Sequence, residues 1–214
     1  MMKQSILPIL LGSNGSGLSG CENDAIIMYN LFYKFHLSNS LSDKWLKPQI
    51  LLNNQVKLNL IEQIIKNNNL EKLIFYYSGH GYKNGRLSFA NSNQIYQVIS
   101  QNINQKIEIT FIIDSCHSGS FPLFSNHFPN ITKSNLIASC KSYQKSTESL
   151  ALDDLNLFMY MKPKYKRNKN FITGIFTYNF ACILFKENKF SYNFHTKPIW
   201  KDIEYIAKQS ITIK

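Results

Sequence analysis

A histidine and a cysteine in this sequence each follow an apolar run and are each bordered by small residues. His80 lies in "YYSGHG" (76–81), and Cys116 lies in "FIIDSCHSG" (111–119). A cysteine thiolate attacks carbonyl carbons, and a nearby imidazole can accept the thiol proton and later protonate a leaving amine. The flanking glycines let backbone N–H groups approach the oxyanion that forms. Together, the two motifs predict acyl-transfer chemistry.

Each residue taken singly has a simpler interpretation. A cysteine at the end of a strand is most often a small buried hydrophobe, and a lone histidine more often makes a local hydrogen bond than catalyses a reaction. The catalytic hypothesis therefore depends on both motifs lying at strand ends that meet.

Short strands that alternate with helices would bring the two motifs together. Apolar runs of strand length end in small or polar residues, as expected for strands buried on both faces. Helical spacing of apolar residues lies between them. This alternation predicts an α/β fold with a mostly parallel sheet, in which ligands bind outside the carboxyl ends of the strands. The strand runs are 5–12, 48–52, 72–78, 107–114 and 134–139, and the helical runs are 22–35, 56–67 and about 95–103.

Prolines, glycines and capping residues add detail. Pro8 counts against a central position for the first strand, because it cannot donate a ladder hydrogen bond. The pair Asn84-Gly85 predicts a tight antiparallel turn. Near the C-terminus, residues 172–188 predict a helix with Thr173 as its cap.

The chain has a formal charge of +11, from 24 basic and 13 acidic side chains. Such a charge attracts nucleic acid or anionic membrane surfaces non-specifically. The basic residues are scattered except in "MKPKYKRNKNF" (161–171), for which a solvated loop is the default interpretation. A nucleic-acid or membrane-surface module is supported by net charge alone, and steep salt dependence of polyanion binding would identify it.

Four cysteines, Cys21, Cys116, Cys140 and Cys182, show no zinc-like spacing with the five histidines. We expect reduced thiols and a cytoplasmic protein, because the N-terminal apolar run is too short for a spanning helix and a cleaved signal would remove the first strand. Cys140, close to the predicted site, is expected to be partly reactive, and Cys182 to lie in the core.

The quoted motifs resemble the metacaspases, a family of caspase-like cysteine peptidases. Three more segments are similar to that family: "LLGSNGSGLSGCENDA" (10–25), "ASCKSYQKSTES" (138–149) and "GIFTYNF" (174–180). The resemblance covers about 10–185. It implies a caspase-like α/β/α sandwich with a mostly parallel central sheet.

The resemblance also implies a single peptidase domain over 1–214, without a prodomain. A part like the large subunit would span about 1–150, a basic linker about 151–171, and a part like the small subunit about 172–214. Metacaspases are mostly monomers, so we expect a monomer.

The basic linker contains the residue types after which such an enzyme would cut. Self-cleavage near Lys166 or Arg167 is one hypothesis, and a solubilising surface loop is the other.

The resemblance implies a role for each residue of the two motifs. His80 would be the general acid and base, and Cys116 the nucleophile. The backbone amides of Gly81 and Cys116 would form the oxyanion hole. His117, next to the nucleophile, is expected to be structural.

Metacaspases cleave after Arg or Lys by means of an acidic pocket, and the matching positions are Cys21, Asp24, Ser78 and Asp114. Two carboxylates beside the nucleophile would pair with a cationic side chain and reject an anionic one. We therefore expect polypeptide substrates with Arg or Lys at the cleaved position. Asp24 has a second interpretation, as an ordinary acidic residue in the first turn of a helix.

Many metacaspases bind calcium through aspartates near the catalytic residues, and this sequence departs from that pattern. Residues 81–104 and 118–128 contain no Asp or Glu. A hard divalent cation needs several oxygen ligands, including carboxylates. We therefore expect calcium-independent activity with no cofactor. A displaced site using Asp153 and Asp154 is the alternative.

The leading hypothesis is an Arg/Lys-specific cysteine endopeptidase. A catalytically silent caspase-like binding or regulatory domain is the alternative, and the presence of both dyad residues and both pocket carboxylates argues against it. Caspases and legumains are the other peptidase possibilities, and an acidic pocket disfavours the Asp specificity of caspases.

Overall fold

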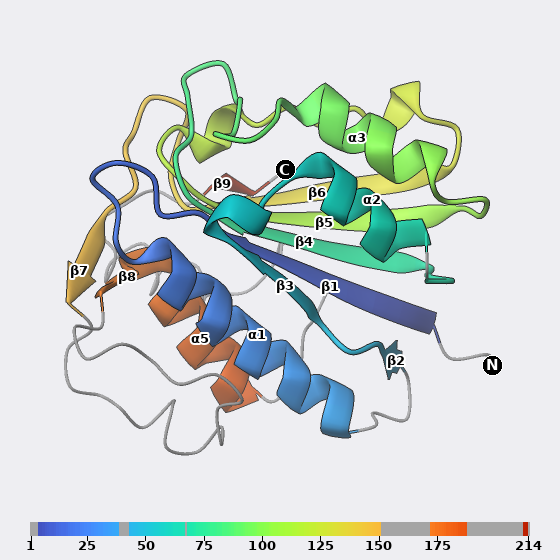
Figure 1. Ribbon diagram of the computed structural model, residues 1–214, viewed down its shortest axis with the longest axis horizontal. Helices are drawn as coiled ribbons and strands as arrows, with labels where there is room; N and C mark the ends of the chain where they lie inside the picture. Colours follow the sequence, from blue (N-terminus) through green and yellow to red (C-terminus); the bar gives the residue numbers. More distant parts are fainter. Residues whose placement is uncertain (1–3, 39–42, 67, 151–171, 188–211, 214) are drawn as a thin grey trace.

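The computed structural model describes residues 4–38, 43–66, 68–150, 172–187 and 212–213. Its centre is a sheet with the strand order β2-β1-β4-β5-β6-β9, in which β3 also pairs with β1 (Figure 1). The pairings are parallel except for β6 with β9. The strands are β1 (Gln4–Gly12), β2 (Asp43–Trp45), β3 (Gln49–Leu52), β4 (Lys72–Ser78), β5 (Ile107–Asp114), β6 (Ile131–Ala138) and β9 (Thr212–Ile213).

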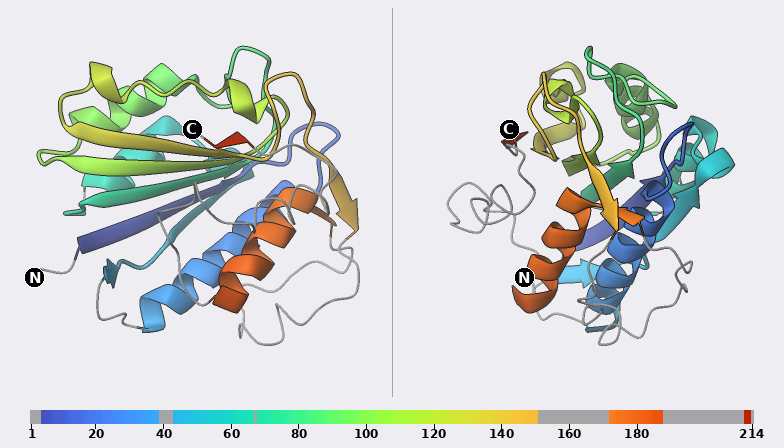
Figure 2. Two further views of the ribbon diagram at one scale, coloured as in Figure 1. Left: turned by 180° about the vertical axis from the view of Figure 1, so that it is seen from behind. Right: turned by 90° about the vertical axis from the view of Figure 1, so that its left-hand side faces the viewer.

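Two helices cover each face of the sheet (Figures 1 and 2). Helices α1 and α5 pack over one hydrophobic cluster, and α2 and α3 over another. These layers confirm the predicted α/β sandwich. None of the helices in the described ranges is long and apolar enough to cross a membrane. The helices are α1 (Cys21–Ser38), α2 (Leu58–Lys66), α3 (Ser92–Gln101) and α5 (Ile175–Glu187), with 3-10 turns η1 (Asn53–Gln55), η2 (Ser118–Ser120) and η3 (Ser125–His127).

Strands β4 and β5 form the centre of the sheet and coincide with the predicted runs 72–78 and 107–114. Successive side chains of a strand point to opposite faces. Tyr76 accordingly joins the cluster under α1 and α5, whereas Tyr77 joins the cluster under α2 and α3. Because both faces are covered, both strands are apolar almost without interruption.

Pro8 lies inside β1, which has neighbours on both sides, so the expectation against a central position is wrong. The Ile6 carbonyl accepts a hydrogen bond of 2.8 Å from the Leu46 N–H, so even-numbered residues of β1 direct their backbone groups toward β2 and β3. The register with β2 ends at Ile6, and the register with β3 begins at Ile9. Pro8 falls between them, where a missing N–H removes no ladder bond.

The predicted turn at Asn84-Gly85 is confirmed. Gly85 has a φ of +75°, and its N–H donates to the Tyr82 carbonyl at 2.9 Å. Gly81 and Leu87 form an antiparallel bridge across the turn.

The helix predicted over 172–188 begins later than expected. Residues Ile172–Gly174 form strand β8, which pairs antiparallel with β7 (Glu148–Leu150), and α5 begins at Ile175. The β-branched Ile172 and Thr173 suit a strand, and their pairing with a segment distant in sequence overrides the helical pattern. Thr173 is therefore not a helix cap.

Candidate active site

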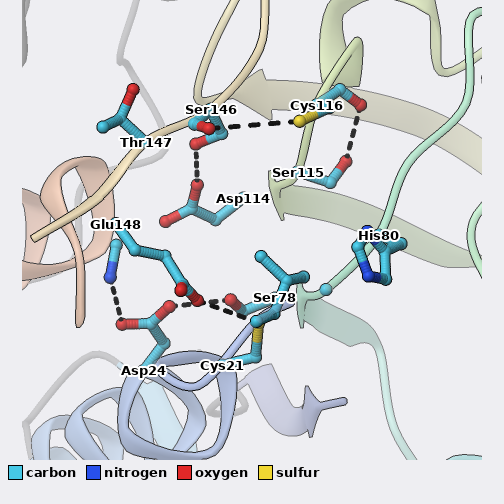
Figure 3. A pocket seen from close by; sticks show the side chains of 13 residues that line it. Cys21, Asp24, Ser78, His80, Asp114, Ser115, Cys116, Ser146, Thr147 and Glu148 are labelled. Carbon is cyan, nitrogen blue, oxygen red and sulfur yellow. Dashed lines mark hydrogen bonds between the residues drawn. The ribbon is translucent and has the colours of Figure 1, made fainter. Parts of the chain in front are cut away.

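The carboxyl ends of β4 and β5 meet at one edge of the sheet. Ser78 is directly opposite Asp114 in the register, and the Gly79 N–H donates to the Asp114 carbonyl at 3.2 Å. A pocket opens at this edge (Figure 3). Six residues proposed from the sequence line it, namely Cys21, Asp24, Ser78, His80, Asp114 and Cys116.

Cys116 follows β5 in a sharp turn that leaves its side chain half-buried. Its Sγ lies 4.0 Å from the Ser146 carbonyl oxygen. The next residue, His117, has a φ of +57°, and its N–H donates to the Gln144 carbonyl at 2.8 Å. The His117 Nδ1 lies 2.8 Å from the Ser142 carbonyl. Both contacts hold the loop that includes Ser146, in agreement with the structural role expected for His117.

His80 lies in the turn after β4, with its ring half-exposed. Its Nε2 is 3.0 Å from the Ser16 carbonyl oxygen. A carbonyl can only accept, so Nε2 carries the hydrogen in this contact and Nδ1 of the neutral ring keeps a lone pair. That lone pair is what a general base needs.

Gly81 follows His80 where two backbone segments approach closely. A Cβ at this position would collide with the Cys116 carbonyl oxygen and would lie 2.9 Å from the Ser115 Cβ. Only glycine fits such an approach. The backbone amides of Gly81 and Cys116, the predicted oxyanion hole, therefore lie on adjoining segments.

The two pocket carboxylates are almost fully buried, with Asp24 1% and Asp114 4% exposed. Asp24 accepts hydrogen bonds from the Ser78 hydroxyl (2.7 Å), the Gly174 N–H (2.8 Å) and the Thr173 hydroxyl.

Asp114 accepts from the Ser146 hydroxyl (2.6 Å) and from both the hydroxyl (2.6 Å) and the N–H (3.2 Å) of Thr177. A Cβ added to Gly174 would lie 3.0 Å from the Asp24 Oδ2 and would collide with Asp114. The two carboxylates thus flank Gly174.

Burial and, after it, the neighbouring Asp114 carboxylate raise the pKa of Asp24 from 3.8 to about 8, although the hydrogen bonds from Thr173, Ser78 and Gly174 act in the opposite direction. Burial also raises the pKa of Asp114. Ion pairs among the described residues involve only Lys66 and Lys72, so no described cation neutralises this pair. An empty pocket therefore retains a proton near neutral pH.

Glu148 brings a third carboxylate to the pocket and was missed in the sequence. Its Oε1 accepts from the Gly20 N–H at 3.0 Å and from the Cys21 thiol at 3.5 Å, and its Oε2 accepts from the Ser19 N–H at 3.3 Å. Burial is the main cause that raises the pKa of the Cys21 thiol, so Cys21 is a hydrogen-bond donor here. The position of Glu148 in the segment 138–149, which also resembles the family, was the signal that the sequence offered.

Other lining residues come from loops and from β8. Ser146, Thr147 and Gly174 lie next to β7 or in β8, and their places depend on the pairing of these two strands, which no local pattern of the sequence shows. The full set of these other lining residues is Leu18, Gly79, Ser115, Ser146, Thr147 and Gly174.

Two further cysteines singled out in the sequence, Cys140 and Cys182, do not line the pocket. Cys140 is fully buried, and burial raises the pKa of its thiol, so the expectation of a partly reactive thiol is wrong. Cys182 packs against the core but is half-buried. Lys166 and Arg167 lie outside the described residues. Within the described ranges, no group of three or more His, Cys, Asp or Glu side chains could hold a metal ion.

The arrangement combines a half-exposed thiol, an imidazole with a free lone pair and a buried acidic pocket. The sequence model of the caspase domain matches residues 10–192. No curated protein matches the chain.

Proposed function

Because the chain belongs to the caspase-domain family of cysteine peptidases, we propose that it is a metacaspase-like endopeptidase that cleaves after Arg or Lys. One observation carries the proposal. Asp24 and Asp114 are buried together beside Cys116, and no described cation pairs with them.

The two carboxylates are oriented to receive a cation. A carboxylate offers about four lone-pair sites. Asp24 accepts from Thr173, Gly174 and Ser78, and Asp114 accepts from Ser146, Thr177 and Ser139. A guanidinium or ammonium entering the pocket would complete both with charge-assisted hydrogen bonds. An aspartate side chain would add a further negative charge to the pair, so caspase-type substrates are disfavoured.

The catalytic steps follow from the roles of the dyad. His80 takes the thiol proton of Cys116 at Nδ1, and the thiolate attacks the carbonyl carbon after the bound Arg or Lys. The amides of Gly81 and Cys116 donate to the oxyanion. As the C–N bond breaks, His80 gives its proton to the leaving amine, and a thioester remains. Water, deprotonated by His80, then hydrolyses the thioester and restores the thiol.

The Ser16 carbonyl supports this proton cycle. By accepting from Nε2 at 3.0 Å, it fixes the tautomer with the basic Nδ1 and stabilises the imidazolium that forms. The β1–α1 loop that contains Ser16 is itself held through the contacts of Ser19 and Gly20 with Glu148.

We also propose that activity is independent of calcium, and that the chain cuts itself near Lys166 or Arg167. The first rests on the absence of carboxylates from residues 81–104 and 118–128. The second rests on the cluster of Lys and Arg in the basic linker. An active enzyme that stays intact after long incubation, with no new N-terminus in 161–171, would contradict self-cleavage.

The decisive experiment compares two fluorogenic peptides that differ only in ending with Arg or Asp. Each is incubated with the wild-type protein and with Cys116→Ala, in calcium and in chelator. We expect cleavage after Arg alone, dependent on Cys116 and equal in both solutions. Cleavage after Asp would contradict the acidic pocket, and a strict calcium requirement would contradict the missing metal site. No cleavage of either peptide would favour a catalytically silent binding domain.

A further inference from the structure

Two loops next to the nucleophile each present two exposed cations. The first loop follows His80 and includes Lys83 and Arg86, and the second follows β6 and includes Lys141 and Lys145. Both loops rise from the same end of the sheet in Figures 1 and 2. We call these four side chains the basic rim.

Ser120, in the turn after Cys116, links the two loops. A Cβ on Gly85 would collide with the Ser120 carbonyl oxygen. On its other side, the Ser120 hydroxyl donates to the Ser142 carbonyl at 3.4 Å. The tip of the first loop and the start of the second therefore both contact the turn that holds the nucleophile. The guanidinium of Arg86 stays with its own loop, 6.0 Å from the centre of the Tyr82 ring.

The basic rim has no acidic residue in its own segments. Residues 81–104 and 115–147 contain neither Asp nor Glu. The ion pairs seen in the described part of the chain, Lys66 with Glu62 and Lys72 with Glu108, belong to other elements. No ion pair among the described residues includes a rim side chain, and Glu148, the carboxylate that follows the second loop, is bound by Ser19, Gly20 and Cys21. Gathered like charges of this kind create a positive potential that attracts anions.

We propose that the basic rim binds acidic residues on the carboxyl side of the cleaved bond. The preferred substrate would then be a peptide in which Arg or Lys is followed by Asp or Glu. This inference rests on the proposed function and extends it from one subsite to the adjoining segment of the substrate.

The roles of the dyad decide on which side of the bond the acidic residues lie. His80 protonates the leaving amine, so the departing segment must pass His80. The loop with Lys83 and Arg86 begins directly after His80. The amino side of the substrate, by contrast, begins at the residue whose side chain occupies the acidic pocket. Lys83 and Arg86 therefore face the leaving segment, and the contacts of Ser120 with both loops bring the loop of Lys141 and Lys145 next to theirs.

The acidic pocket and the basic rim would bind side chains of opposite charge on neighbouring residues of the substrate. An exposed ion pair contributes little by itself, but several cations around one cleft increase the rate of encounter and disfavour like-charged partners. The rim would therefore discriminate most strongly against substrates with Lys or Arg on both sides of the cleaved bond.

The test uses three internally quenched peptides that are identical up to the cleaved Arg and continue with Glu-Glu, Gln-Gln or Lys-Lys. We expect kcat/KM for the Glu-Glu peptide to exceed that for Gln-Gln about five- to tenfold, and Lys-Lys to be cleaved most slowly. Salt at about 0.5 M should remove most of this difference, because exposed charges are screened.

Two variants with equal changes in net charge identify the surface responsible. The rim variant replaces all four rim residues by Gln, and it should lose the Glu-Glu preference while cleaving the Gln-Gln peptide as fast as wild type. The control variant should keep the preference, because it neutralises exposed lysines near the amino ends of the strands. The control substitutions are Lys44→Gln, Lys47→Gln, Lys106→Gln and Lys133→Gln.

The outcomes separate this inference from the proposed function. Equal cleavage of the Glu-Glu and Gln-Gln peptides by wild type overturns the inference and leaves Arg/Lys cleavage intact. A preference that survives in the rim variant overturns the role of these four residues. No cleavage of any peptide overturns the proposed function, and the inference falls with it.

Discussion

The buried carboxylates and the proposed catalytic pair line one pocket but are built differently. Asp24 and Asp114 are almost fully buried, and several hydrogen-bond donors orient each carboxylate. His80 and Cys116 are half-buried, and their side chains make weaker polar contacts, at 3.0 Å from the Nε2 of His80 to the Ser16 carbonyl and at 4.0 Å from the Sγ of Cys116 to the Ser146 carbonyl. Under the proposed function, the recognition groups are thus oriented before the substrate arrives, whereas the reacting groups remain open to it.

This difference suggests a division of the free energy of catalysis. Preorganised groups lose little conformational entropy when a ligand binds, so the pocket would supply affinity and selectivity. The groups that change protonation and form covalent bonds need access and some freedom. The two regions should therefore respond differently to substitution.

The largest effect is expected from Cys116→Ala, which should abolish cleavage, by more than about ten-thousandfold in kcat, because no nucleophile remains. Binding of agmatine, a small guanidinium compound, should be unchanged, because the pocket is intact. Calorimetry of this variant measures binding without turnover. A variant that lost agmatine binding as well would show that pocket and dyad form one unit, against the comparison.

The converse substitution, Asp114→Asn, should lower kcat/KM for an Arg peptide about a hundredfold, as expected when one partner of a buried charge pair is removed. The amide can keep the existing contacts, because the Ser146 hydroxyl can turn to accept from it. Alkylation of Cys116 by iodoacetamide, followed by mass spectrometry, should keep its wild-type rate. The half-exposed Glu62, which pairs with Lys66 on α2, gives the matched control Glu62→Gln. Unchanged Arg cleavage in Asp114→Asn would contradict a role of Asp114 in binding the substrate cation.

The pocket should also respond to pH, because a raised carboxyl pKa means that the folded protein binds the proton more tightly than the unfolded chain. The stability due to Asp24 is therefore complete below about pH 4 and is lost as pH rises through about 8. A bound cation favours the ionised carboxylate, so its binding releases the proton from the pocket. Agmatine affinity should rise about tenfold per pH unit up to about pH 8.

The matched measurement is calorimetry of Cys116→Ala at pH 7 in two buffers with different heats of ionisation. About one proton should be released for each agmatine bound. Binding without proton release would show that both carboxylates are already ionised in the empty pocket.

A smaller effect, about threefold in kcat/KM, is expected from Glu148→Gln, because this half-buried carboxylate is better solvated than the buried pair. If Glu148 acts on the cation, KM should rise. If it acts through the β1–α1 loop on His80, kcat should fall and its pH profile should shift. The second result would link the two regions that the structure separates.

The sequence sufficed where local pattern determines structure. The apolar runs predicted β4 and β5, and the polar residues that end them predicted the dyad edge. Glu148 was missed, and Thr173 was wrongly expected to be a helix cap. The places of both depend on the pairing of β7 with β8, two short strands that are distant in sequence. Long-range pairing of this kind leaves little trace in propensity or periodicity.

Pro8 has a consequence for the association of this protein with further copies of itself. Because β1 changes partners there, one edge of the sheet consists of β2 and β3, which have three and four residues. Pro48 lies between them, and Lys44 and Lys47 on this edge are exposed. Short edge strands, proline and lysine all hinder strand-to-strand aggregation. This edge is therefore protected against the β-stacking that a sheet so rich in Ile, Leu and Phe would otherwise invite.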